Sequence, residues 1–90
     1  MNDYERHLEE QLKDPEFAAE WERQRPKREY VKAIIAARIE QNLTQKELSQ
    51  KTGIRQSNIS RIENGDCSPT VATLQQIADG IGKTLHIEFR

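Results

Sequence analysis

Apolar residues recur every three or four positions through most of this chain, which is the period of an amphipathic helix. The clearest example is the stretch YVKAIIAARIE at residues 30–40, whose apolar side chains fall on one stripe. Pro26 suits the first turn of such a helix, and Asn42 can adopt the left-handed conformation that ends it. We therefore predict one long helix ahead of residue 42.

Three shorter helices are expected after it. Thr44 and Glu47 match the capping-box pattern S/T-x-x-E and predict a short helix that Gly53 ends. The next helix should run over residues 55–63, up to an Asn-Gly pair, and the last over residues 70–82, behind a proline and up to a glycine. The expected fold class of this part of the chain is all-α.

The period changes to two in the last eight residues, KTLHIEFR. Leu85, Ile87 and Phe89 alternate with polar residues, as in a half-buried β-strand. A lone strand needs a partner for its backbone hydrogen bonds, so we predict that residues 83–90 pair with the same segment of a second copy in a twofold dimer. The alternative is a frayed tail whose apolar side chains pack on the preceding helix.

The first 25 residues form a separate helical arm. Asp14 and Pro15 have the residue types of a helix cap and a first helical position, so one helix should end before them and a second should start there. The apolar residues are too sparse for a self-sufficient core and instead resemble an amphipathic surface that lies in a partner's groove. These residues are Tyr4, Leu8, Leu12, Phe17 and Trp21. The alternative is that the arm folds back on its own chain.

The formal net charge of −1 hides an uneven distribution along the chain. Residues 1–25 carry eight acidic and four basic residues, residues 26–66 carry eight basic and five acidic residues, and residues 67–90 are balanced. An acidic arm therefore precedes a basic middle, and this arrangement suits two different partners better than one.

Several classes of protein are disfavoured by the composition. No apolar run approaches the roughly 20 residues of a membrane span and no leader-like region is evident, so a cytoplasmic protein is expected. Cys67 has no second cysteine for a disulfide, and His7 and His86 lie too far apart to suggest a zinc site with it. Without a nucleophile–base pair, a metal-ligand cluster or a glycine-rich phosphate loop, we expect no enzyme, no metal and no cofactor.

The stretch TQKELSQKTGIRQSNISRIENG at residues 44–65 has a distinctive order of residue types. Gln45 starts the helix, Ser49 is a small residue where two helices would cross, and Gly53 stands at the turn, where a tight connection needs it. Apolar residues occupy Leu48, Ile54, Ile59 and Ile62. With these features residues 31–82 resemble the helix-turn-helix domain of the Cro and phage-repressor (XRE) family, and the whole chain resembles the HigA-type antitoxins. The resemblance implies a lambda-repressor-like domain at residues 26–82.

Two features depart from the family pattern. Arg55 stands where the family often has a serine or threonine cap, so the cap must come from elsewhere or be missing, at a cost of about 1 kcal/mol. The fifth helix of the phage repressors has no counterpart here, and the predicted strand occupies its place, as in the antitoxin branch.

The resemblance implies that the helix at residues 55–63 enters the major groove of double-stranded operator DNA. Helical spacing then puts Gln56, Ser57 and Ser60 near the groove floor, with Asn58 and Arg61 toward its edges. Glutamine can bind adenine bidentately, arginine can bind guanine in the same way, and serine is adaptable.

Other residues of this surface are expected on the phosphate backbone. By resemblance, Gln45 would sit on a phosphate with the amides of its helix N-terminus. Lys46 and Arg55 would supply salt-dependent affinity, together with Lys51 and either Lys27 or Lys32. The alternative for all of these residues is an ordinary solvated polar face.

Arg38 lies on the apolar stripe of the long helix, where an unpaired cation would be costly. A partner is therefore expected. Glu63 is the candidate, because the matching positions in the phage-repressor family form an internal ion pair, and both residues are assigned a structural role.

Two functions compete after this comparison. The first, implied by the resemblance, is the antitoxin of a type II toxin-antitoxin pair, which neutralises a HigB-like ribonuclease toxin through residues 1–25 and represses its own operon as a homodimer in the bacterial cytoplasm, on the nucleoid when DNA-bound. The second is a stand-alone XRE-family transcriptional repressor whose arm is only structural. The acidic, aromatic arm and the C-terminal segment are the features that favour the first.

Overall fold

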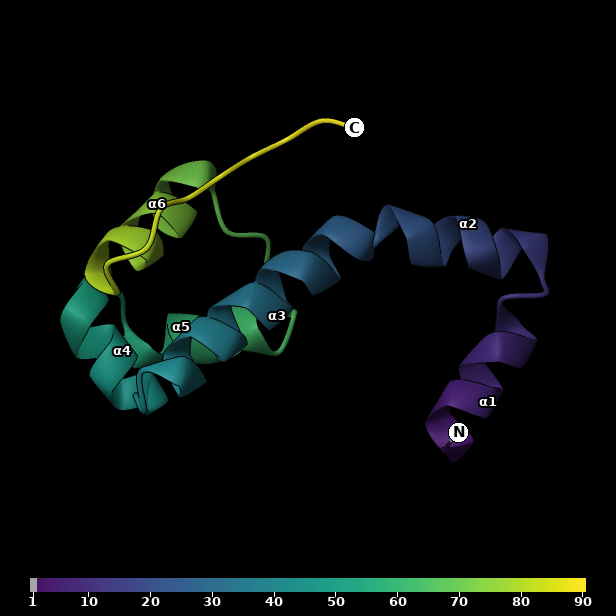
Figure 1. Ribbon diagram of the computed structural model, residues 1–90, viewed down its shortest axis with the longest axis horizontal. Helices are drawn as coiled ribbons and strands as arrows, with labels where there is room; N and C mark the ends of the chain where they lie inside the picture. The colour runs from purple at the N-terminus through teal and green to yellow at the C-terminus, as the bar shows by residue number, and fades with distance from the viewer. Residues whose placement is uncertain (1) are drawn as a thin grey trace.

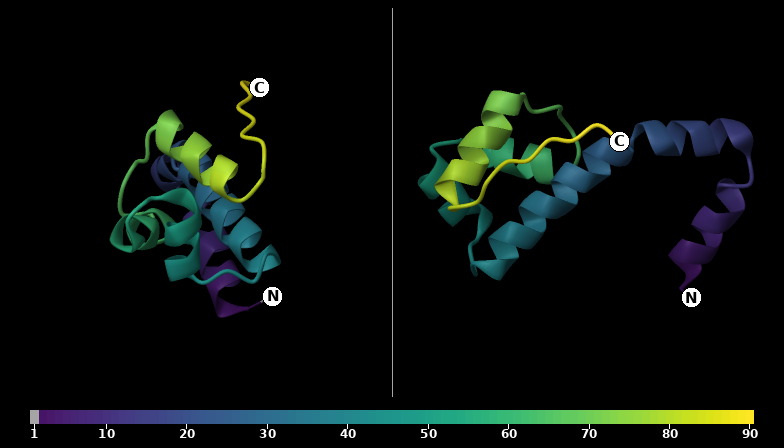
Figure 2. Two further views of the ribbon diagram at one scale, coloured as in Figure 1. Left: turned by 90° about the vertical axis from the view of Figure 1, so that its left-hand side faces the viewer. Right: turned by 45° about the horizontal axis from the view of Figure 1, so that its top comes forward.

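The computed structural model describes residues 2–90, and every regular element in that part of the chain is an α-helix. The prediction of an all-α domain is confirmed. Helices α3 to α6 form a bundle, and α1 and α2 extend away from it, with α1 turned at an angle to α2 (Figures 1 and 2). The helices are α1 (Asp3–Gln11), α2 (Pro15–Arg23), α3 (Arg25–Glu40), α4 (Gln45–Thr52), α5 (Gln56–Glu63) and α6 (Val71–Gly80).

Most helices begin at a side chain that caps them. Asp14 accepts a hydrogen bond from the Glu16 amide at 3.0 Å and opens α2, as its position before proline predicts. Thr44 and Glu47 form both hydrogen bonds of the predicted capping box at α4, each 3.0 Å long. Two helices lack such a cap: Gln24 precedes α3, and Arg55 precedes α5, without a side-chain hydrogen bond. The departure from the family pattern noted at Arg55 is therefore real.

Left-handed residues end two of the helices at the expected positions. Asn42 has φ of 57° just after α3, and Gly53 has φ of 76° just after α4. Both conformations let the chain reverse direction within a few residues. As a result α4 and α5 are joined by only three residues and pack directly on each other.

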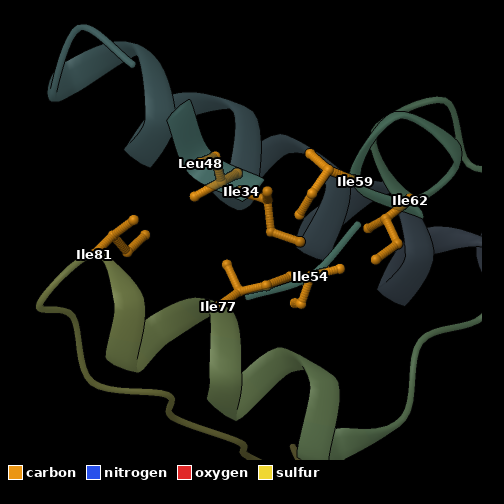
Figure 3. Close-up of a cluster of buried hydrophobic side chains, with 7 residues drawn as sticks. All are labelled: Ile34, Leu48, Ile54, Ile59, Ile62, Ile77 and Ile81. Carbon is orange, nitrogen blue, oxygen red and sulfur yellow. The ribbon is translucent and has the colours of Figure 1, made fainter. Parts of the chain in front are cut away.

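The core lies where α3, α4, α5 and α6 meet. Leu48 and Ile59 are its two most completely buried large side chains. Five isoleucines from α3, α5, α6 and the adjoining turns surround them, as Figure 3 shows: Ile34, Ile54, Ile62, Ile77 and Ile81. All four apolar positions of the family pattern belong to this cluster, so the pattern describes the packing that sets α5 against α4.

Helix α6 approaches the end of α4 unusually closely. A Cβ atom at Gly80 would lie 2.7 Å from Thr52 Cγ2 and 3.0 Å from the Lys51 carbonyl oxygen, which is too close for any side chain. Gln76 strengthens the same contact, because its amide donates to the Thr52 carbonyl at 2.7 Å. Glycine at position 80 thus allows α6 to close the bundle. Nothing in the hydrophobic pattern indicated this requirement.

The predicted C-terminal strand is wrong for the single chain. Across residues 2–90 no strand is formed, and residues 83–90 follow an extended path without a regular partner (Figure 1). Alternation of apolar and polar residues favours an extended backbone, but a strand also needs a neighbour to pair with its amides and carbonyls. None of the helices offers such an edge.

Candidate nucleic-acid interface

Helix α5 has two sharply different faces. Ile59, Ile62 and Glu63 are buried against the bundle. Gln56 and Ser57 are exposed on the opposite side, and so are the three residues Arg55, Asn58 and Arg61, whereas Ser60 is half-buried. Within residues 2–90 no hydrogen bond engages the exposed side chains of this row, so their donors and acceptors are free for another molecule.

Two of these residues lie on the side of α5 that faces α6. Arg55 and Asn58 line a hollow whose other wall includes Thr73 and Gln76 of α6. Their side chains therefore flank the exposed row at Gln56 and Ser57. The position expected for Asn58 at the edge of the DNA groove stays a prediction.

An ion pair with α3 fixes the buried side of α5. Arg38 Nε lies 2.9 Å from Glu63 Oε2, and Arg38 Nη2 lies 3.0 Å from Oε1, so the pair is bidentate. The third donor of Arg38 reaches the Leu43 carbonyl at 2.9 Å. Side-chain exposure is 18% for Arg38 and 4% for Glu63. The structure thus brings together the two residues that were expected to pair, and both charges have partners.

Gln45 joins this network, which sequence reasoning missed. Its Nε2 donates to Glu63 Oε1 at 3.2 Å. The amide nitrogen carries two hydrogens, and one hydrogen bond leaves the second available to an acceptor outside the protein. Gln45 therefore ties the start of α4 to the end of α5 while remaining half-exposed. The family pattern indicated the residue, but the contact to Glu63 lies eighteen positions away and no local signal predicts it.

The turn between α4 and α5 is braced by two hydroxyl groups. Ser49 donates to the Ile54 carbonyl oxygen, and Thr52 accepts from the Ile54 amide at 3.2 Å. The small side chain predicted at the crossing thus serves a second purpose as a hydrogen-bond donor. These contacts hold α5 at a fixed angle to α4.

The two helix N-termini on this surface are electrostatically different. At α4 the Thr44 amide donates to the Glu47 carboxylate, and together with the Thr44 side chain it lowers the pKa of Glu47. At α5 there is no carboxylate and no side-chain cap, and Arg55 adds a positive charge. The first amides of α5 therefore retain the partial positive charge that attracts anions. Lys46 is exposed in the first turn of α4.

The arm presents a different surface. No residue of α1 or α2 is buried, and Tyr4 is 68% exposed. Leu8, Leu12, Phe17 and Trp21 are all half-buried at most. Of the five expected apolar residues, Tyr4 is therefore exposed and the other four are partly covered.

Side-chain contacts between α2 and α3 anchor the arm to the bundle, among them an ion pair of 2.7 Å between Glu22 and Arg25. The Arg28 guanidinium stacks on the Trp21 ring at 3.6 Å from its centroid and donates to the Trp21 carbonyl at 2.7 Å. Phe17 also stacks on Trp21, with the two ring centroids 6.2 Å apart. We call Trp21 and Arg28 the arm staple. It was not predicted, because the two residues lie on different helices.

The C-terminal residues leave large apolar side chains uncovered. Phe89 is 99% exposed and Ile87 is 57% exposed, whereas Leu85 is half-buried near α3 and α6.

Two kinds of feature are absent from residues 2–90. No helix there is both long and apolar enough to cross a bilayer, and no group of three or more candidate metal ligands occurs there.

Comparison with known proteins agrees with this architecture. The helix-turn-helix family HTH_3 matches residues 34–87. Antitoxin HigA1 of Mycobacterium tuberculosis is 32% identical over 74 residues, which is 82% of this chain and 50% of that protein. An uncharacterised HTH-type transcriptional regulator of Haemophilus influenzae is 37% identical over 57 residues, covering 63% of this chain and 58% of that protein.

A third relative, an uncharacterised HTH-type transcriptional regulator of Sinorhizobium fredii, is 39% identical over 52 residues, covering 58% of this chain and 66% of its own length. The chain thus spans between half and two-thirds of the length of these relatives. No solved structure matches it at a comparable level of significance. The resemblance drawn from residues 44–65 is confirmed by these matches.

Proposed function

The chain belongs to the helix-turn-helix family, and on that premise we propose that it is an antitoxin that binds operator DNA through α5 and neutralises a small basic toxin through its arm. The DNA-binding part rests on one observation. The exposed polar side chains of α5 make no hydrogen bond within residues 2–90, while the ion pair of Arg38 and Glu63 fixes the buried side of the helix. In this docking mode α5 lies in the major groove, and α4 crosses the phosphate backbone.

Each residue of the interface has a role in this proposal. Gln56 and Ser57 contact base edges, with Ser60 beside them and Asn58 and Arg61 at the margins. The phosphate contacts come from Gln45, through its second amide hydrogen, from Lys46 and Arg55, and from the free amides of α5. Because Gln45 is also bound to Glu63, a phosphate held by it would be positioned by the same network that positions α5.

Substitution of Gln56 tests this assignment. Gln56→Ala should weaken binding to the operator by about 1–3 kcal/mol and leave binding to random DNA nearly unchanged, because a base contact is lost and no phosphate contact is. Gln75→Ala, at an exposed position of α6, is the control and should change neither. Fluorescence anisotropy at two salt concentrations measures both affinities. Equal losses on operator and random DNA would mean that Gln56 does not contact bases.

The toxin-binding part rests on the arm. None of its apolar side chains is buried and Tyr4 is exposed, its net charge is negative, and the arm staple holds α2 in a defined direction from the bundle. The similarity to Antitoxin HigA1 supports the same assignment, because any unbroken 74-residue stretch of this 90-residue chain includes residues 17–74 and so takes in most of α2. A HigB-like ribonuclease is the partner we propose, with Tyr4, Leu8, Leu12, Phe17 and Trp21 as its contact surface.

Co-purification from the native cell tests the arm. The tagged full-length chain should retain a second small basic protein, detected by mass spectrometry, and the double variant Tyr4→Asp/Leu8→Asp should lose it while still binding operator DNA. Glu10→Gln, on the other face of α1, is the matched control and should retain the partner.

A stand-alone repressor is the second candidate function. The arm staple favours it, because Arg28 and Trp21 give α2 a contact within its own chain. If the full-length chain retains no partner and the double variant represses as well as the original, the arm is structural and this second function is correct.

The repressor acts as a homodimer on a twofold operator in this proposal, with Leu85, Ile87 and Phe89 at the interface. The exposure of Ile87 and Phe89 supports this, because neighbouring large apolar side chains on a surface can mark a protein–protein contact. Light scattering should give twice the chain mass of 10.5 kDa. A single-chain mass at all concentrations would remove the dimer from the proposal.

A further inference from the structure

An apolar groove runs between α3 and α6. It encloses about 470 Å³ and is closed on one side by residues 83–86. On α3 three alanines, Ala33, Ala36 and Ala37, line it together with Tyr30, Ile34 and Glu40, and the α6 side contributes Leu74, Ile77 and Ala78. Ala33 and Ala36 are exposed to solvent, so the α3 wall is open. A groove of this kind accepts apolar side chains, because its floor offers few polar partners to water.

The chain's own C-terminal segment does not fill this groove. Leu85 reaches its edge, but Ile87 and Phe89 beyond it are exposed. In Figures 1 and 2 the last residues leave α6 and run in the direction of the start of α3. There they border a polar hollow lined by Arg25, Pro26 and Glu29 of α3 together with residues of the segment itself. The molecule thus carries an apolar groove and an apolar segment that do not meet within one copy.

We infer that the groove of one copy receives Ile87 and Phe89 of a second copy, and that the exchange is reciprocal. A reciprocal exchange is the arrangement of a twofold dimer, in which the same two surfaces meet twice. The charges are compatible, because Lys83 and Glu40 form an ion pair of 3.2 Å at the groove rim and the inserting segment carries Glu88 and Arg90 beside its apolar residues. The inference rests on the proposed homodimer and adds which surfaces meet in it.

Two variants separate the groove from the segment that fills it. Phe89→Asp damages the segment, and Ala36→Glu damages the groove at an exposed position where folding should be unaffected. Each variant alone should raise the dimer dissociation constant by roughly 100-fold or more, because both contacts of a twofold dimer are lost together. Ile39→Glu is the control, since Ile39 is exposed on the same helix outside the groove, and it should leave the dimer intact.

Mixing the two variants gives the sharpest test. In a mixed dimer the intact segment of the Ala36→Glu copy meets the intact groove of the Phe89→Asp copy, so one of the two contacts is restored. Light scattering and native mass spectrometry of the full-length chains should therefore detect mixed dimers at concentrations where each variant alone is monomeric. Circular dichroism checks that every variant is folded, and Ala33→Glu replaces Ala36→Glu if the latter is not.

Each other outcome overturns the inference in a recognisable way. If Ala36→Glu stays dimeric and Phe89→Asp does not, the segments meet each other and the homodimer stands without the groove. If both variants stay dimeric, or if both are monomeric and mixing restores nothing, the groove does not receive the segment. If the unsubstituted chain is itself monomeric, the proposed homodimer fails together with this inference.

Discussion

Helices α1 and α2 of the arm are each nine residues long, and helices α4 and α5 of the bundle are each eight, yet the two pairs are held by different forces. In the bundle every helix buries side chains in one shared core, whereas neither arm helix buries any. Isolated helices of this length are marginal in water, so caps and surface contacts alone provide little stability. The bundle is therefore held in place by its own core, whereas the position of the arm depends on its surface contacts, such as the arm staple.

The ion pairs of the two regions differ in the same way. Arg38 and Glu63 are largely shielded from water, and each guanidinium nitrogen and each carboxylate oxygen of the pair has a hydrogen-bond partner. Glu20 and Arg23 of α2 lie 2.7 Å apart but are more than half exposed, and exposed pairs contribute little. Distance alone is thus a poor guide to the strength of an ion pair in this molecule, and burial is the better one.

The largest difference should appear when the same substitution is made in both regions. Leu48→Ala removes a side chain of 0% exposure and should lower the free energy of unfolding by about 3–5 kcal/mol. Leu8→Ala, in the arm, should change it by no more than about 0.5 kcal/mol. Urea denaturation followed by circular dichroism measures both. Comparable losses would mean that the arm shares the core of the bundle.

The ion pairs provide the second comparison. Glu63→Gln leaves Arg38 without its countercharge and weakens the contact to Gln45, and should cost about 3 kcal/mol of stability. Glu20→Gln should cost less than about 0.5 kcal/mol, because its partner Arg23 is solvated. The same denaturation experiment applies. A silent Glu63→Gln, accompanied by unchanged DNA affinity, would remove the structural role assigned to the pair.

Close packing of α6 on α4 gives a third test. Gly80→Ala should destabilise the bundle by about 1–3 kcal/mol, because the new methyl group overlaps Thr52. In an unconstrained helix the same change stabilises, so the sign of the effect is informative. Ala19→Ser, which adds one heavy atom at an exposed position of α2, should stay within about 0.5 kcal/mol. A stabilising Gly80→Ala would show that the two helices separate without cost.

The arm staple should matter locally more than globally. Arg28→Met keeps the apolar stem but loses the guanidinium on Trp21, and should change the free energy of unfolding by about 1 kcal/mol at most. Amide hydrogen exchange in α2 should nevertheless become faster, because its stacking contact and hydrogen bond to α3 are lost and the remaining pair of Glu22 and Arg25 is exposed. Arg23→Met, which removes an exposed cation outside the staple, should leave that exchange slow. Unchanged exchange in Arg28→Met would mean that α2 is held by other contacts.

The smallest expected effect is on stability at acidic pH. Hydrogen bonds from Thr44 hold the pKa of Glu47 below its ordinary value of 4.5, so the carboxylate favours the folded state above that pH, and this contribution is lost as pH falls through the lowered pKa. Glu47→Gln can keep the capping box but cannot titrate. Its stability should therefore fall less steeply below pH 4.5 than that of the unsubstituted chain. Identical pH profiles from thermal unfolding would mean that the box contributes nothing measurable.

Helix ends were predictable here because they depend on neighbouring residues. Three such signals involve residues within four positions of each other: Asp14 before Pro15, the capping box of Thr44 and Glu47, and the glycine at 53. Every residue that each signal needs is therefore visible in a short stretch of sequence. The two faces of α5 were predictable for a related reason, since a regular helix converts spacing directly into direction. Which of the exposed residues touch DNA stays a prediction.

Contacts between distant positions were not predictable in the same way. Gln45 with Glu63, Trp21 with Arg28, and Gly80 with Thr52 join different helices, and no periodicity reports them. Glu63 with Arg38 was anticipated only through the cost of an unpaired cation and the family resemblance. The prediction of a C-terminal strand was wrong because alternation of apolar and polar residues indicates an extended backbone but does not identify a second strand to pair with it.

The absence of buried side chains in α1 and α2 has a consequence for how this protein can change over generations. Substitutions in the arm carry little penalty in folding, so its sequence is free to follow a changing partner while the bundle stays the same. A different arm, joined ahead of Arg25 with tryptophan kept at position 21, should fold beside an unaltered bundle. In the proposed function, recognition of protein and recognition of DNA would in this way diversify independently within one chain.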